Sequence, residues 1–173
     1  DTVEMLYNLG CEIIQKPFSV GARIEHPQKL INKAQYGDFA GNEKLGAADY
    51  KLACHGLHER GAYTFCMCPG GTVVAAASEK GGVIVNGMSS LARDGENANS
   101  ALLVGIEPKD FPSEHPLAGI YYQREIEHNA FLLGGGDYKA PAQLVGDFLV
   151  GQGKHKTRRC KAHLPHGSYA YKH

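Results

Sequence analysis

Apolar side chains occupy every second position in two parts of the chain, as they do in strands with one buried face. In residues 18–25 this alternation places Arg23 and Glu25 together on the polar side. Residues 62–89 hold three apolar runs joined by glycine pairs, a pattern that favours an antiparallel meander. The predicted strands cover 18–25, 62–68, 72–79, 83–89 and 100–107.

Other segments carry apolar residues at helical spacing. Asp1 and Glu4 have the pattern of a capping box, and Pro27 suits the first turn of a helix. A long apolar stripe follows Pro116 and ends at three successive glycines. The predicted helices cover 1–10, 27–37, 115–136 and 141–150. Together these elements predict an α+β fold, an antiparallel sheet or partial barrel with flanking helices.

The composition suits one globular domain. Of the 173 residues, 43% are hydrophobic, which is enough to bury a core. We assign residues 1–150 to this domain, and we expect residues 151–173, which are rich in Lys, Arg and His and contain no acid, to form a basic, poorly ordered tail. The chain opens with Asp1 in a helical pattern and has no initiator methionine, which indicates a piece of a longer protein.

Charge and cysteine content narrow the range of partners. The 18 basic and 18 acidic residues cancel, so no overall field attracts nucleic acid or an anionic membrane. The sequence has no apolar stretch of about 18 residues, the length that a membrane helix requires. Five cysteines without the spacing of a disulfide framework indicate a reduced, cytoplasmic protein.

The cysteines Cys66 and Cys68 lie one residue apart at the end of an apolar run. With Cys54 and His58 they offer four zinc ligands, but the C-x-C spacing fits a structural zinc site poorly. A disulfide between them would close a strained ring, so a redox pair is also disfavoured. Packing of both thiols on one strand face is the plain alternative. A non-catalytic zinc or nucleic-acid-binding module that uses these four residues and the basic tail is the second hypothesis for the chain.

Three segments are candidates for contact with a ligand. In the Pro69-Gly70-Gly71 turn, the N–H groups of the two glycines can face an anion or lie beneath a planar ring, although a hairpin turn needs the same residues. The segments RIEHP and RDGENANSA supply groups that handle protons or orient a ligand, although ion pairs and solvated loops have the same composition. The candidate catalytic residues are Arg23, Glu25 and His26, and the candidate cofactor-binding residues are Cys66, Cys68, Gly70, Gly71, Arg93, Asn97 and Asn99.

Seven runs of sequence are distinctive when they are taken together and in order. They are KPFSVGARIEHPQ, AQYG, LGAADYKL, YTFCMCPGGTVVAAASE, GGVIVNGMS, RDGENANSALLV and DYKAPAQLVGDFL. In this order they resemble the bacterial FAD-dependent dehydrogenases described as uncharacterised NAD(FAD)-utilising flavoproteins. The resemblance covers about residues 1–150, and the segment after them departs from the family pattern.

The resemblance implies a flavoenzyme with a Rossmann-like FAD-binding part, in which this chain is a substrate-side domain inserted between the two flavin-binding halves. It implies FAD as the cofactor of the full-length protein, with NAD(P) as a second nucleotide. The expected partners are the flavin-binding halves of the same polypeptide and a small-molecule substrate, and the isolated chain is expected to be inactive. In this arrangement the strand end from Cys66 to Gly71 would approach the flavin or the substrate.

Overall fold

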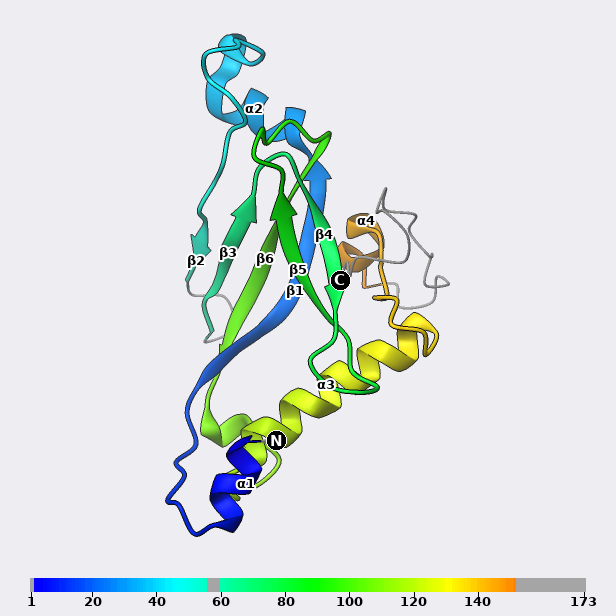
Figure 1. Ribbon diagram of the computed structural model, residues 1–173. Coiled ribbons are helices and arrows are strands. Elements are labelled where there is room, and N and C mark those ends of the chain that lie inside the picture. Colours follow the sequence, from blue (N-terminus) through cyan, green and yellow to red (C-terminus); the bar gives the residue numbers. More distant parts are fainter. Residues whose placement is uncertain (1, 56–59, 152–173) are drawn as a thin grey trace.

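The computed structural model describes residues 2–55 and 60–151, and Figure 1 shows how their elements are arranged. A long antiparallel sheet forms the centre, a two-stranded hairpin lies in front of it, and a long helix crosses its lower end. The α+β prediction is confirmed. Asp1, His58 and the basic segment 152–173 lie outside the described residues.

Four strands form the main sheet in the order β1-β6-β3-β2, and every pair is antiparallel. β1 and β6 pair over ten residues, with Arg23 opposite Ala101 and Glu25 opposite Asn99. Residues that face each other in this register share a face, so the predicted placement of Arg23 and Glu25 on one side is confirmed. The strands are β1 (Phe18–Pro27), β2 (Ala53–Cys54), β3 (Ala62–Cys68) and β6 (Asn97–Ile106).

The remaining strands, β4 (Gly71–Ala76) and β5 (Ile84–Ser89), pair only with each other. The predicted meander is therefore wrong at one point, because β3 does not pair with β4. Both edges of β3 are already occupied, one by β6 and one by β2. The Pro69-Gly70-Gly71 turn instead carries the chain out of the main sheet, so that the hairpin lies across one face of it. We call that side the inner face.

The helices follow the sequence prediction closely, with one exception. The fourth helix was predicted over 141–150 but contains only five residues. Ala140, Pro141 and Ala142 are buried before it begins, and Ala140 packs with Val83 and Ala130 in a small core cluster. The helices are α1 (Thr2–Asn8), α2 (Gln28–Tyr36), α3 (Ala118–Gly134) and α4 (Val145–Leu149), with 3-10 turns at Gly37–Phe39 and Pro108–Asp110.

Helix α3 is attached to the rest of the domain at two places. Near its start, Ala118 packs with Ile106 and Phe111, and the ring of Phe111 stacks on Phe18 of β1 with centroids 5.5 Å apart. Near its end, Ala130 packs with Val83 before β5. These contacts hold α3 against the sheet at one end and the hairpin at the other. No helix among the described residues is long and apolar enough to cross a membrane.

Candidate functional site

A buried arginine lies at the centre of the inner face. Arg23 is only 5% exposed, and its Nε donates a hydrogen bond to Oδ1 of Asn99, 2.9 Å away. Its Nη2 donates to the carbonyl oxygen of Cys66 at 2.5 Å and lies 3.6 Å from the sulfur of Cys68. Residues predicted from three separate motifs therefore meet at one guanidinium. Sequence analysis gave no reason to join them.

An irregularity in β3 brings Cys66 and Cys68 to this guanidinium. The register shifts between Phe65 and Cys68, which lie opposite Ala101 and Asn99, so β3 has one residue more than its partner. Cys66 has a φ of +45°, a left-handed conformation that costs energy for any residue other than glycine. The bulge points the Cys66 carbonyl at Arg23 and leaves its side chain exposed. The thiol of Cys66 is therefore exposed, whereas the thiol of Cys68 is partly buried beside Arg23. The two thiols do not pack together on one face of a regular strand.

The hairpin closes over this group at a glycine. A Cβ atom at Gly87 of β5 would lie less than 3.0 Å from Asn99 Oδ1, Arg23 Nη2 and Cys68 Sγ. The backbone of β5 can pass so close only because position 87 has no side chain. We call Arg23, Cys66, Cys68, Gly87 and Asn99 the guanidinium cluster.

The positive charge of this cluster has no carboxylate partner within the described part of the chain. Burial lowers the pKa of Arg23, while the nearby Cys68, Cys66 and Tyr50 oppose that change. Guanidinium groups nevertheless stay protonated in proteins. Asn99 is fully buried, and its Nδ2 finds no acceptor among the same residues. Within the described residues, the cluster thus holds a cation without an anionic partner and an amide donor without an acceptor.

The other predicted catalytic residues do not join Arg23. Glu25 shares its face but accepts hydrogen bonds from Asn97 Nδ2 at 2.8 Å and from the N–H of Val73 at 3.4 Å. It therefore links the main sheet to β4. His26 points to the opposite face, where its Nε2 lies 2.8 Å from the hydroxyl of Tyr50.

Tyr50 is a neighbour that sequence analysis did not single out. Burial raises its pKa, and a hydrogen bond with Ser100 and the charge of Arg23 oppose that change. Its loop position gave no periodic signal in the sequence. The three candidate residues of RIEHP therefore have separate places. Arg23 belongs to the guanidinium cluster, Glu25 links the main sheet to β4, and His26 pairs with Tyr50 on the opposite face.

The glycine turn is held by protein groups. The N–H of Gly70 donates to Oε1 of Gln28 at 2.8 Å, and the carbonyl of Gly70 accepts from Gly95 at 3.2 Å. Gly71 is buried against Met88 of β5. Arg93 is exposed, and its carbonyl packs against Gly70. Through these contacts the turn and Arg93 help to fix the position of the hairpin. The predicted cofactor contacts at Gly70, Gly71 and Arg93 stay predictions.

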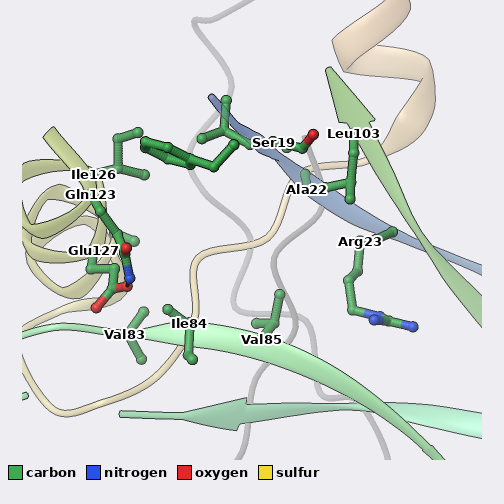
Figure 2. Close-up of a pocket in the computed structure, with 15 residues that line it drawn as sticks. Ser19, Ala22, Arg23, Val83, Ile84, Val85, Leu103, Gln123, Ile126 and Glu127 are labelled. Carbon is green, nitrogen blue, oxygen red and sulfur yellow. Dashed lines mark hydrogen bonds between the residues drawn. The ribbon is translucent and has the colours of Figure 1, made fainter. Parts of the chain in front are cut away.

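A cleft of about 400 Å³ lies between the sheet, the start of β5 and α3. Figure 2 shows the residues that line it. Gln123, Ile126 and Glu127 of α3 lie on one side, and Val83, Ile84 and Val85 follow one another below. Arg23 lies on the side opposite α3. Ala22, Ala101 and Leu103 add apolar surface. The walls of the cleft are therefore largely apolar, with Arg23 at one end and the polar side chains of Gln123 and Glu127 at the other.

The zinc ligands of the second hypothesis are not brought together in the described residues. Cys54 lies opposite Ala62, which is four residues and about 13 Å along the strand from Cys66. Within 2–55 and 60–151 no group of three or more His, Cys, Asp or Glu side chains is arranged to hold a metal ion. His58 and the basic tail lie outside these ranges.

Comparison with protein families matches residues 17–172 to the family described as "FAD-dependent protein, C-terminal domain-like". The chain belongs to this family. The family description supports FAD as the cofactor of the full protein and names a C-terminal domain, where the sequence interpretation expected an inserted one. The match also continues past residue 150, into the segment that the sequence analysis described as departing from the family pattern.

A relative of this FAD-dependent family domain is an uncharacterised protein of Clostridium beijerinckii. The two are 57% identical over 150 residues, which make up 86% of this chain but only 28% of the relative. The chain thus spans less than a third of the length of that protein. The relative's description names no reaction and no substrate.

Proposed function

We propose that this domain forms the substrate-side wall over the flavin of an FAD-dependent oxidoreductase of the dehydrogenase type, with the flavin-binding regions in another part of the same polypeptide. Membership of an FAD-dependent family and the small share of the longer relative support the proposal. The observation that carries it is the guanidinium cluster, in which the buried cation has no anionic partner and the Nδ2 of Asn99 has no acceptor within the described residues. Groups of this kind are expected where a ligand completes the site.

The described residues fit a role beside the flavin better than a role in holding its phosphates. Every strand pair in them is antiparallel, so they contain no parallel βαβ unit of the kind that binds a dinucleotide. When bound, FAD accepts or donates a hydride. Arg23 would then supply positive charge beside the reacting molecules, and the buried Asn99 would hold the guanidinium in place through its Oδ1. The exposed side chain of Cys66 would lie at the edge of that site.

Chemical modification of Cys66 tests this arrangement. The protein expressed from its complete reading frame should purify yellow, with FAD bound. Reaction with a bulky maleimide should then change the flavin absorbance spectrum, because the label at Cys66 would lie beside the ring. The change should disappear in Cys66→Ser.

Cys11 provides the matched control. It is also an exposed free cysteine, but it lies in the segment between α1 and β1. Cys11→Ser should keep the full spectral change on labelling. The proposal fails if the purified protein contains no flavin, or if Cys66→Ser responds to the maleimide as the unmodified protein does.

A further inference from the structure

The arginines of this domain differ in their partners. Arg60 lies 2.5 Å from a carboxylate oxygen of Asp110, and Arg124 lies 2.9 Å from Glu79. Both of these arginines are partly exposed, where water alone would solvate them. Arg23 is the buried one, and it has no acidic partner in the described ranges. Arg23 therefore carries the buried charge that most needs an anion, and it has none in the described ranges.

The guanidinium also has hydrogen-bonding capacity left. Arg23 donates through Nε to Asn99 and through Nη2 towards Cys66 and Cys68, while Nη1 has no acceptor among residues 2–55 and 60–151. A guanidinium carries two protons on that nitrogen. The unused Nδ2 of Asn99 is a second, independent donor in the same cluster. The charged guanidinium, which lines the cleft, calls for an acceptor that carries negative charge, whereas Asn99 does not line the cleft.

The opposite end of the cleft has the other sign. Glu127 of α3 is 8% exposed, and its Oε1 accepts a hydrogen bond from Gln123 at 2.7 Å. No cation pairs with Glu127 in the described part of the chain. A ligand with an anionic group at each end would meet this carboxylate. The cleft therefore favours one anionic end, at Arg23.

We propose that the cleft binds a small organic monocarboxylate with an apolar body, its carboxylate bound by Arg23 and its body between β5 and α3. A cleft of about 400 Å³ is within the range of ligand sites and suits a single ring or a short acyl chain. The apolar side chains of Val83, Val85 and Ile126 supply the matching surface. The further step, that this carboxylate is the substrate of the enzyme, rests on the proposed function. Its binding does not.

Matched pairs of acids and amides test the site. Benzoate, phenylacetate, indole-3-acetate and octanoate would be titrated calorimetrically into the protein expressed from its complete reading frame, each beside its neutral amide. At least one acid should bind about tenfold or more tightly than its amide, the factor expected from one charge-assisted hydrogen bond. Arg23→Gln should remove that preference. Arg60→Gln, which also removes one arginine but lies outside the cleft, should keep it.

A second variant guards against misfolding of Arg23→Gln. Ile126 is 39% exposed on α3 and lines the cleft, so Ile126→Glu adds a negative charge there without disturbing the hydrogen bonds of Arg23. It should weaken binding of the acid more than binding of the amide. The inference is overturned if none of the four acids binds more tightly than its amide. It is also overturned if the preference persists in folded Arg23→Gln, or in Ile126→Glu where Arg23→Gln does not fold.

The two proposals can fail separately. If acids bind through Arg23 but labelling of Cys66 leaves the flavin spectrum unchanged, the carboxylate site stands and the position over the flavin does not. If labelling changes the spectrum but no acid is preferred, the wall over the flavin stands and the carboxylate site does not.

Discussion

The inner face has one end that the β4–β5 hairpin covers and one end that is open towards α3. The covered end is the more polar of the two, which is the reverse of the usual relation between polarity and burial. Where the β4–β5 hairpin covers the sheet, the enclosed side chains are polar, including Arg23, Glu25 and Asn99. Where the sheet is left open towards α3, the surface of the cleft is largely apolar, with Ala101 and Leu103 among its walls. Folded proteins normally bury the second kind of surface and expose the first.

This inversion separates two tasks of the same strands. A hairpin that covers polar groups gains little from the hydrophobic effect, so its position depends on specific hydrogen bonds and on glycines that allow close approach. An apolar cleft left open costs some stability and keeps room for another molecule. The covered end is therefore expected to be sensitive to small changes of shape, and the open end tolerant of them.

The largest effect is expected at Gly70, in the turn that carries the hairpin over the covered end. Its φ is +55°, and an added Cβ would lie less than 3.0 Å from the carbonyl of Arg93. Gly70→Ala should lower the free energy of unfolding by about 4 kcal/mol, from the sum of backbone strain and overpacking. Urea unfolding of the purified protein measures it.

The matching substitution at Gly10 distinguishes backbone strain from overpacking. Its φ is also positive, at +84°, but a Cβ there would meet nothing within 4 Å. Gly10→Ala should cost only about 1 kcal/mol, the price of the left-handed backbone alone. Equal losses at Gly10 and Gly70 would show that packing of the turn against Arg93 contributes nothing.

The next effect compares the two ends directly through two glycines in strands. Gly87→Ala would push a methyl group into the guanidinium cluster and should cost about 2 kcal/mol. Gly105 lies opposite Ser19 at the open end, where a Cβ meets nothing within 4 Å. Gly105→Ala should change the stability by no more than about 0.5 kcal/mol. Thermal unfolding of the two variants side by side tests the comparison, which breaks if Gly105→Ala proves the more harmful.

A smaller effect should depend on pH at Tyr50, behind the covered end. Tyr50→Phe removes the hydrogen bond with His26 and should cost about 1 kcal/mol near neutral pH. Burial raises the pKa of Tyr50 above its usual 10.0, so the unfolded chain loses this proton first as the pH rises. The stabilisation is complete below pH 10.0 and is lost as the pH rises through the folded pKa.

The difference in stability between the unmodified protein and Tyr50→Phe should therefore shrink above pH 10.0. Urea unfolding of both proteins near neutral pH and in the alkaline range measures this difference. A gap of constant size across the range would contradict the burial of the hydroxyl.

The smallest effect is expected at the open end. The hydroxyl of Tyr63 donates to Ser19 Oγ at 2.7 Å, in an exposed pair. Tyr63→Phe should cost about 0.5 kcal/mol, the low end for a hydrogen bond, because water replaces the lost partner. A loss as large as that of Gly87→Ala, measured in the same urea titration, would remove the contrast between the two ends.

Much of the fold could be predicted from the sequence, because alternation and helical spacing are local. The strand over 18–25, the helix from Pro27 and the long helix after Pro116 all formed close to the expected bounds. The pairing of β3 could not be predicted in this way. Whether a glycine turn returns a strand beside its neighbour or lifts it onto another layer depends on which edges distant strands have taken.

The site was predicted in its members but not in its grouping. Arg23, Cys66, Cys68 and Asn99 were all candidates, chosen from three separate motifs. Their meeting depends on the register between β1, β6 and β3, which no single motif contains. Gly87 gave no signal, because a glycine required by close approach looks like any other glycine in a strand.

The extra residue in β3 has a consequence for how this sequence can change. Loss of the codon for Cys66 would restore an even ladder, with Cys68 still opposite Asn99 and Phe65 still opposite Ala101. Such a deletion would suit the sheet, yet it would take away the carbonyl that Arg23 binds. A relative that needed only the fold could lose this codon. A relative that uses the charge of Arg23 would have to keep the bulge in β3.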